Sequence, residues 1–395
     1  MVEEAVARAV ADAVDPGEVL AYARALIAAP SENPGGTEDA AATVASEILG
    51  ALGAAPRTIR SGAGRPNVLA SLGSGARPKL AWNGHLDVVP AGVAENWNHG
   101  PWAGDVADGR LVGRGSADMK GPIAAALAAG AAIVRTGVGL AGTLEYHLVA
   151  DEELAGVHGT SVLWDQGLLD QDAAVVGEPS ELQVGLAERG GAWVTLTAFG
   201  TAAHGSQPHR GVNAITSMSR YLLRLSEVLP DVEHPLTGRP TVNAALIAGG
   251  SAPNVVPDRC EVDVDRRLIP GETDPEQVLA PFLTLAEDLR RAHPDVRVEA
   301  SLREWTDAAE ASPDTRLVRD ARAAVLAETR RDPDLVGFTG ITDARFYINQ
   351  ARVPTIILGP GSLSVAHAAN ESVAVDELVT AARAYARLFV SFLNP

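Results

Sequence analysis

Carboxylate and imidazole side chains recur at the ends of apolar runs along this sequence. Each follows a strand-like segment or lies beside a glycine-rich turn, and the set comprises His85, Asp118, Glu153, Glu178 and His367. Polar groups at the carboxyl ends of strands in an α/β sheet meet at one edge, even when they are far apart in the sequence. Carboxylates and imidazoles gathered in this way are what a hydrolase with two metal ions requires. The sequence is therefore expected to fold around a sheet that brings these strand ends together.

The composition limits the size of the domains and the kinds of partner. A chain of 395 residues is long for one domain, so two domains are expected. The 32 Lys and Arg residues against 50 Asp and Glu residues give a formal net charge of -18. Nucleic acids and anionic membranes would repel such a chain, so both are excluded as partners.

The single cysteine, Cys260, rules out a disulfide within the chain. It lies in an alternating, strand-like segment, which favours a buried and unreactive thiol over a nucleophile. Residues 1–20 are acidic, resemble a helix and lack the apolar core of a secretion signal. The apolar runs are shorter than a membrane span, and the cytoplasm is the expected compartment.

The first part of the chain alternates helix-like and strand-like segments. Residues 37–53 have helical spacing, and residues 121–137 have a proline in the first turn and a glycine at the end. Between and after these helices, strand-like runs cover 79–87, 143–150 and 172–177. The alternation predicts an α/β domain with a mixed, mostly parallel sheet and helices on both faces.

The middle of the chain follows a different order. Strand-like and helix-like segments succeed one another there as β-α-β-β-α-β, over residues 191–200, 213–229, 241–250, 259–269, 274–292 and 296–304. This order predicts a ferredoxin-like α+β domain. The α/β style returns from about Thr306, so we expect a catalytic domain made of residues 1–186 and 306–395. Residues 187–305 would form an inserted lid and dimerisation domain.

Each candidate ligand also has a simpler reading when it is taken alone. A single His or Glu at a strand end is usually a solvated loop residue. Asp118 could cap the helix that follows it, and Glu152 and Glu153 could be acidic residues favoured by a helix dipole. The joint pattern of all these motifs, in one order along the chain, favours the metal site.

The motifs together resemble those of the M20 metallopeptidase family. That group includes acetylornithine deacetylase, succinyl-diaminopimelate desuccinylase, aminoacylase-1 and glutamate carboxypeptidase. The resemblance spans nearly the whole chain and is carried by the stretches GHLDVVP, GRGSADMKG, ADEEL, VGEPS, TAAHGSQPHRGVNAI, NVVPDRCEVDVDRRLIPGE and GPGSLSVAHAANE. It implies an α/β catalytic domain with an inserted lid that forms a homodimer, in agreement with the segmentation above.

The resemblance also implies a ligand set for two divalent metal ions. One ion takes His85 and Glu178, the other takes Glu153 and His367, and Asp118 bridges the two. The three carboxylates supply three of the four negative charges that two divalent cations require. Mixed imidazole and carboxylate ligands suit zinc, with cobalt and manganese as alternatives.

Further roles follow for residues around the metal ligands. Glu152 is then free to act as general base, and Asp87 would orient the imidazole of His85. In the lid, the resemblance implies that His204 steadies the tetrahedral oxyanion in the active site of the partner subunit.

Substrate contacts are implied for three more residues. Arg267 resembles the family's clamp for a substrate carboxylate, and strand alternation would place its neighbour Arg266 on the opposite face. Asn254 and Thr342 are further candidates. The stretch around Thr342 is looser than the common Gly-Gly-Thr-Asp form, and Asn370 replaces the usual aspartate before Glu371.

The sequence therefore predicts a metal-dependent amidohydrolase that removes an acyl group from an N-acyl amino acid. A dipeptidase or a glutamate-carboxypeptidase-type enzyme is the alternative within the family, with a dipeptide as substrate. A binding protein on a disabled scaffold would have lost a ligand or the base, and all of these are present. A dinucleotide enzyme is disfavoured because GRGSADMKG lacks the Rossmann spacing.

Overall fold

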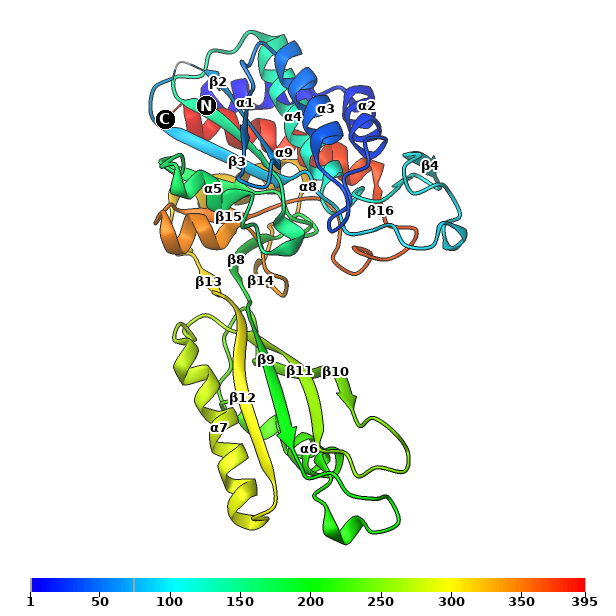
Figure 1. Ribbon diagram of the computed structural model, residues 1–395. Helices are drawn as coiled ribbons and strands as arrows, with labels where there is room; N and C mark the ends of the chain where they lie inside the picture. The colour runs from blue at the N-terminus through cyan, green and yellow to red at the C-terminus, as the bar shows by residue number, and fades with distance from the viewer. Residues whose placement is uncertain (1, 74, 395) are drawn as a thin grey trace. The chain divides into compact units, whose positions relative to one another are not determined.

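The computed structural model describes residues 2–73 and 75–394 and divides into two compact units (Figure 1). The main unit contains the chain up to Leu186, Glu310–Phe338 and the chain from Thr342 onward. The inserted unit contains Ala187–Ala309 together with Thr339–Ile341. Each unit has its own sheet and is described separately below.

The main unit is built on a mixed sheet in the order β1-β2-β6-β3-β7-β15-β8-β13, with β14 paired to β8. The central strands β6, β3, β7 and β15 are mutually parallel, whereas β2 pairs antiparallel with β1 and β6, and β8 antiparallel with β15. The strands are β1 Arg57–Arg60, β2 Pro66–Gly73, β3 Lys79–His85, β6 Thr143–Val149, β7 Ala173–Val176, β8 Val184–Glu188, β13 Ala309–Glu310, β14 Leu335–Phe338 and β15 Thr355–Ile357. The predicted α/β class is confirmed.

Helices cover both faces of this sheet. On one face α4 (Lys120–Thr136) and α9 (Val375–Leu393) contact β3, and α1 (Val2–Asp12), α2 (Pro16–Ile27) and α8 (Arg316–Thr329) pack on these two helices. Trp82 points to this face, where its ring meets Tyr385 of α9 edge-on at 5.8 Å. The next residue back, Ala81, points to the other face, as alternation in a strand requires. There it packs in one core cluster with Leu163 of α5 (Thr160–Asp165) and with Phe346, which lies in a π-helical turn over Phe346–Gln350.

The prediction of one helix over residues 1–20 was wrong, because the segment forms two helices. The first helix ends at Asp12 and α2 begins at Pro16. The Asp15 carboxylate accepts the backbone N–H of Gly17 at 2.8 Å, as an N-cap does. A proline lacks the N–H that a helix interior needs but is well accommodated in the first turn. A second helix start therefore falls at this position.

The inserted unit has an antiparallel sheet in the order β10-β11-β9-β12, formed by β9 (Gly190–Phe199), β10 (Thr241–Gly249), β11 (Arg259–Leu268) and β12 (Arg297–Thr306). Two helices, α6 (Ala214–Leu222) and α7 (Pro275–Ala292), pack on the sheet around one core cluster that includes Cys260. With α6 after β9 and α7 after β11, the elements follow the β-α-β-β-α-β order.

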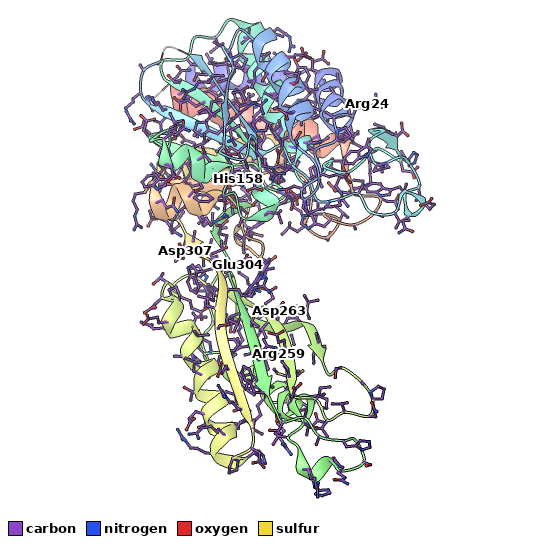
Figure 2. The ribbon with its side chains drawn as sticks, in the orientation of Figure 1. Arg24, His158, Arg259, Asp263, Glu304 and Asp307 are labelled. Carbon is purple, nitrogen blue, oxygen red and sulfur yellow. The ribbon has the colours of Figure 1, made fainter. Side chains whose placement is uncertain are left out.

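The two faces of this sheet differ in polarity. Along β11, buried and partly exposed residues alternate, so Arg266 is buried beside Glu272 while Arg267 lies on the open face beside Asp265. Charged side chains such as Arg259 and Asp263 also belong to the open face of β11 (Figure 2). The helix-covered face holds the apolar core, and the open face remains polar.

The main unit also contains a small second sheet that the sequence did not predict. It has the order β16-β5-β4, with β4 Asp105–Ala107, β5 Arg110–Val112 and β16 Ser372–Ala374. Its antiparallel pairing of β5 with β16 brings the segment before Asp118 next to the segment after His367. Among the described residues, every helix is too short or too polar to cross a bilayer.

Candidate active site

The strand register explains why the candidate ligands meet. In the parallel pair of β3 and β7, Asn83 is level with Val176, and His85 and Glu178 each follow two residues later in the same direction. In the pair of β3 and β6, His85 is level with Val149, and Glu153 follows from the loop after that strand end. The parallel strands thus deliver their ligands to one edge of the sheet.

Two glycines allow these strand ends to approach closely. A Cβ atom added at Gly177 would lie 2.2 Å from the Trp82 ring, and one at Gly84 would lie 2.8 Å from it. Only glycine fits beside the buried indole at these two positions. Since Gly84 precedes His85 and Gly177 precedes Glu178, the glycines fix the two ligands against the same core residue.

Five of the predicted ligands form two groups that share Asp118. The first group is His85, Asp118 and Glu178, and the second is Asp118, Glu153 and His367, with the ligand atoms of each group within 4.8 Å of one another. The Nε2 atom of His85 lies 3.0 Å from Oδ1 of Asp118 and 3.5 Å from Oε1 of Glu178. The Nε2 atom of His367 lies 3.0 Å from Oε2 of Glu153 and 3.4 Å from Oδ2 of Asp118. The two oxygens of Asp118 therefore face different groups.

The pKa shifts of the candidate ligands indicate a site that favours positive charge. Burial, followed by the charge of Asp118, raises the pKa of Glu178 well above its ordinary value, and burial also raises the pKa of Glu153. The hydrogen bonds to Asp118 and Glu153 raise the pKa of His367 to about 10. Burial lowers the pKa of His85, but the contact with Asp118 and the charge of Glu178 raise it well above its ordinary value. Protonated imidazoles thus offset the carboxylates where no cation does.

The donor set fits two divalent cations. Imidazole nitrogens and carboxylate oxygens are ligands that such ions accept, and buried carboxylates at these distances repel one another unless a cation lies between them. His367 differs from the other ligands because 53% of its side chain is exposed, whereas those of His85, Glu153 and Glu178 are buried. The second group therefore opens toward the surface of the unit.

Glu152 lies beside the first group without belonging to either group. Its Oε2 atom is 4.0 Å from Nε2 of His85, and its side chain is 9% exposed. Burial, and after it the charge of Glu178, raises the pKa of Glu152 well above its ordinary value. A carboxyl group beside the ligand groups and outside both is placed to accept and return a proton there.

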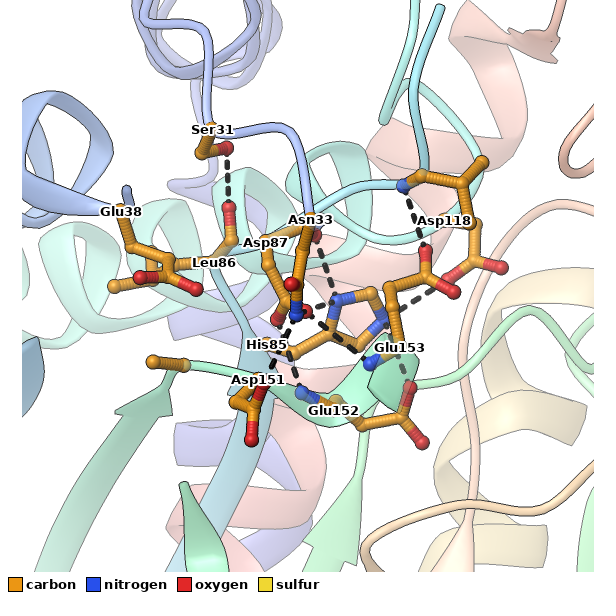
Figure 3. A network of polar contacts seen from close by, with 12 residues as sticks. Ser31, Asn33, Glu38, His85, Leu86, Asp87, Asp118, Asp151, Glu152 and Glu153 are labelled. Carbon is orange, nitrogen blue, oxygen red and sulfur yellow. Dashed lines mark hydrogen bonds and ion pairs between the residues drawn. The ribbon is translucent and has the colours of Figure 1, made fainter. Parts of the chain in front are cut away.

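Asp87 binds the backbone that carries the two adjacent glutamates (Figure 3). Its carboxylate accepts the backbone N–H groups of Glu152 at 3.1 Å and Glu153 at 3.2 Å. His85 donates through Nδ1 to the backbone carbonyl of Asp87 at 2.9 Å, while the Asp87 carboxylate is 3.6 Å from that nitrogen. The orientation of the imidazole thus comes chiefly from the main chain of Asp87.

The sequence analysis missed the residues that support Asp87. The Asn33 amide donates to Asp87 at 2.9 Å and to Asp151 at 3.0 Å (Figure 3). Arg65 also binds Asp151, at 2.6 Å. Asp151 adopts the left-handed conformation with φ 64°, directly before Glu152. Because Asp151 directly precedes the glutamate pair, the sequence could have indicated it as a supporting residue. Asn33 and Arg65 lie in segments without a recognisable motif, so the sequence did not indicate them.

The remaining candidates lie outside the two groups. In the inserted unit, His204 and Asn254 are close together, because Val255 bridges to His204 and the N–H of Gly205 donates to the Asn254 carbonyl at 2.7 Å. Arg267 lies elsewhere in that unit, with its Nε 3.0 Å from Asp265. Thr342 belongs to the main unit and is fully buried, and its hydroxyl accepts the N–H of Ala344.

Comparison with known proteins agrees with this geometry. Residues 81–391 match the profile of peptidase family M20/M25/M40. A succinyl-diaminopimelate desuccinylase from Phenylobacterium zucineum is 31% identical over 95% of this chain and 98% of its own length. A second one, from Methylorubrum populi, is 32% identical over 95% of this chain and 98% of its own length.

Solved structures share the fold at lower identity. An M20 family metallo-carboxypeptidase from Sulfolobus solfataricus superposes with a TM-score of 0.80 at 17% identity, over 95% of this chain and 99% of that one. Human carnosine dipeptidase 1 gives 0.77 at 18% identity over 98% of both chains. A dinuclear metal-binding M20 peptidase from Bacillus subtilis gives 0.72 at 16% identity, over 96% of this chain and 98% of that one.

The family match and the relatives define a hydrolase that acts on amide bonds, and its main unit contains two groups of ligand-type side chains that share Asp118. The chain belongs to peptidase family M20/M25/M40. The predicted family and the predicted class of metal-dependent amide hydrolase are confirmed.

Metal-free protein titrated with Zn²⁺ should bind two ions per chain and release protons. His85 and His367 bind a metal ion as neutral imidazoles. The pKa of His367 is raised to about 10, so it holds a proton to release at pH 7, and the pKa of His85 is raised above its ordinary value as well. Calorimetry in two buffers of different ionisation enthalpy measures the number of protons released.

The Asp118→Ala substitution should weaken the binding of both Zn²⁺ ions, and Glu178→Ala should weaken chiefly one. The exposed Asp170, paired with Lys79, provides the control Asp170→Ala. Binding without proton release would contradict the ligand set.

Proposed function

We propose that the protein removes an acyl group from an N-acyl amino acid, with an N-succinyl amino acid as the first substrate to test. The observation that carries this proposal is the shared Asp118 between two ligand groups, with Glu152 beside them and outside both. The choice of succinyl rests on the names of the relatives that are 31–33% identical. A dipeptide substrate is the second candidate, favoured by the structural likeness to carnosine dipeptidase.

The ligand assignment proposed is His85 and Glu178 for one ion, Glu153 and His367 for the other, and Asp118 for both. When bound, the ions would polarise the substrate carbonyl and lower the pKa of water at the site. Zinc is the metal proposed, with cobalt and manganese as alternatives, because the set mixes imidazole and carboxylate donors. The cytoplasm is the compartment proposed, since the chain has one buried thiol and uses no disulfide.

The chain's own residues supply the proton transfers. Glu152 would accept the proton of the attacking water and pass it to the leaving amine, which requires a carboxyl group that can exist in both forms near neutral pH. The raised pKa of Glu152 supports this assignment. Asp87 holds the Glu152 backbone and thereby keeps the base beside the first ligand group.

A hydrolysis screen tests the proposed function. Zinc-loaded protein is offered N-succinyl, N-acetyl and N-formyl amino acids and a set of dipeptides, and the released amine is measured. The proposal expects the largest kcat/KM among the N-acyl amino acids. A higher value for dipeptides would establish the alternative instead.

Glu152→Gln should lower kcat by at least about 100-fold while KM and bound zinc stay near the wild-type values. The amide keeps the shape of the side chain but cannot take up a proton. The adjacent Glu153→Gln serves as the matched control, because it alters a proposed ligand and should lower the zinc content instead. Zinc content by elemental analysis and steady-state kinetics separate the two effects. The opposite pattern in the two variants would reverse the assignment.

Arg267→Ala should raise KM about 10- to 100-fold for substrates with a free carboxylate, the usual weight of a hydrogen bond to a charged group. Matched substrates with the carboxylate converted to an amide should change little. Arg303, an exposed arginine on β12 that binds Asp263 at 2.8 Å, provides the control Arg303→Ala. Equal effects of Arg267→Ala on both substrate types would exclude a carboxylate clamp.

A homodimer is proposed from the two edges of the inserted sheet. The edge strand β10 carries no charged residue, and its Leu246 and Ile247 are 68% and 63% exposed. The opposite edge, β12, carries Arg297, Glu299, Arg303 and Glu304. Charged residues protect an edge strand from pairing, whereas an uncharged, apolar edge invites it. We therefore assign β10 to the contact between subunits.

The positions of the proposed substrate residues within the inserted unit support a shared active site. Arg267 is level with Gly191 at the start of β9, whereas His204 follows Phe199 at the end of that strand. The two ends of β9 are about 26 Å apart at the usual rise of a strand. One small substrate cannot reach both residues in one chain, so we assign His204 to the active site of the partner subunit.

Mixing His204→Ala chains with Glu152→Gln chains should restore activity that neither parent has. In a mixed dimer, one of the two active sites contains both intact residues.

Leu246→Glu on β10 should give monomers by sedimentation, while Ser301→Glu on the exposed side of β12 should leave the dimer intact. Absence of recovered activity after confirmed subunit exchange would refute the shared site.

A further inference from the structure

Two of the proposed ligands in the second group come from loops far apart in the sequence. Asp118 lies in the turn before α4, and His367 lies in the loop between β15 and β16 with φ 64°. Neither ligand stands directly at a strand end as His85 does. Something other than the main sheet must therefore hold the two loops in register.

A buried ion pair joins these loops. Arg114 and Glu371 meet at 2.6 Å between Nη1 and Oε2, and their side chains are 2% and 0% exposed. Arg114 belongs to the Asp118 segment, and Glu371 belongs to the His367 segment. The pairing of β5 with β16 and the hydrogen bond from the Gly113 N–H to the Glu371 carbonyl at 3.0 Å bring the two partners together.

Each partner also binds the backbone of a proposed ligand. The Oε1 atom of Glu371 accepts the N–H of Asp118 at 3.0 Å and that of Ala117 at 2.9 Å. Arg114 donates through Nη2 to the carbonyl of His367 at 3.2 Å and to that of Pro90 at 3.3 Å. The pair thus contacts the main chain of both Asp118 and His367.

The loop around Trp97 closes over this pair. The Arg114 guanidinium lies 5.4 Å from the centroid of the Trp97 ring. Asn370 accepts the N–H of Asn98 at 2.7 Å and donates to the Asn96 carbonyl at 3.0 Å. An aspartate at position 370 could not make the second bond, because a carboxylate has no N–H to donate.

We propose that Arg114 and Glu371 are positioning residues that set the affinity for the second metal ion. The inference rests on the ligand set proposed above. Asp118 and His367 are both ligands of that ion, and both are held by the pair, whereas the first ion shares only Asp118. Mutation of a group that hydrogen-bonds to a metal ligand usually lowers the metal affinity about 10- to 100-fold.

Glu371→Gln tests the proposal. The glutamine keeps the volume and can still accept N–H groups, but it removes the charge that faces Arg114. Calorimetric titration of metal-free protein with Zn²⁺ should show the second ion, which uses both Asp118 and His367, bound about 10- to 100-fold more weakly. The first ion, which uses only Asp118 of these two, should be weakened less. Absorption of the Co²⁺-loaded protein gives a second readout, since the bands of one ion should weaken.

The matched control is Glu328→Gln. Glu328 forms an ion pair with Arg387 between α8 and α9, with side chains 12% and 9% exposed, away from the ligand segments. Its loss should lower the melting temperature and leave both Zn²⁺ affinities unchanged. If Glu371→Gln and Glu328→Gln bind Zn²⁺ alike, the pair acts on stability alone and the proposal fails.

A double variant, Arg114→Met with Glu371→Met, separates stability from positioning further. Removing both charges leaves no buried charge unpaired, so the chain should fold even if Glu371→Gln does not. The methionines cannot bind the Asp118 N–H or the His367 carbonyl, so weak binding of the second ion should persist. Wild-type affinity in the double variant would overturn the proposal. Failure of the wild type to bind two ions would instead contradict the ligand set itself.

Discussion

Mutual repulsion among buried carboxylates is the constraint on which this structure depends. Asp118, Glu153 and Glu178 are drawn together with Glu152 at one edge of the main sheet, where burial raises the cost of each negative charge. The carboxylates around the two imidazoles raise the pKa of His367 to about 10 and, against the effect of burial, raise the pKa of His85 well above its ordinary value. The charge of the ligand set therefore favours binding of cations.

Two carboxylates outside the ligand set hold the ligand turns in the same manner. Asp87 accepts the N–H groups of the consecutive residues Glu152 and Glu153, and Glu371 accepts those of Ala117 and Asp118. Each thus binds the main chain of a turn and leaves the ligand side chain free to face the metal site. Each support satisfies two backbone N–H groups of a turn with one side chain, which fixes the main chain that carries the proposed ligands.

The sequence was informative where a residue's role depends on its side chain and its strand position. His85 and Glu178 could be placed because each follows an apolar run and the two strands are parallel. Arg114, Asn33 and Arg65 could not be placed, because they act on backbone groups and buried partners that depend on tertiary contacts. The short strands β4, β5 and β16 carry too few residues for a periodic pattern, and the break between α1 and α2 depends on one cap at Asp15.

The two units divide the chemistry between them. All five proposed ligands and the proposed base belong to the main unit, so one chain can assemble the metal site by itself. The inserted unit contains Arg267, His204 and Asn254. Arg267 lies level with the start of β9, and His204 with Asn254 lies beyond the end of that strand. The proposed metal ligands thus come from the fold of one unit, whereas the proposed substrate contacts come from residues that a single chain holds far apart. If two chains share an active site as proposed, turnover would depend on their association, while metal binding would not.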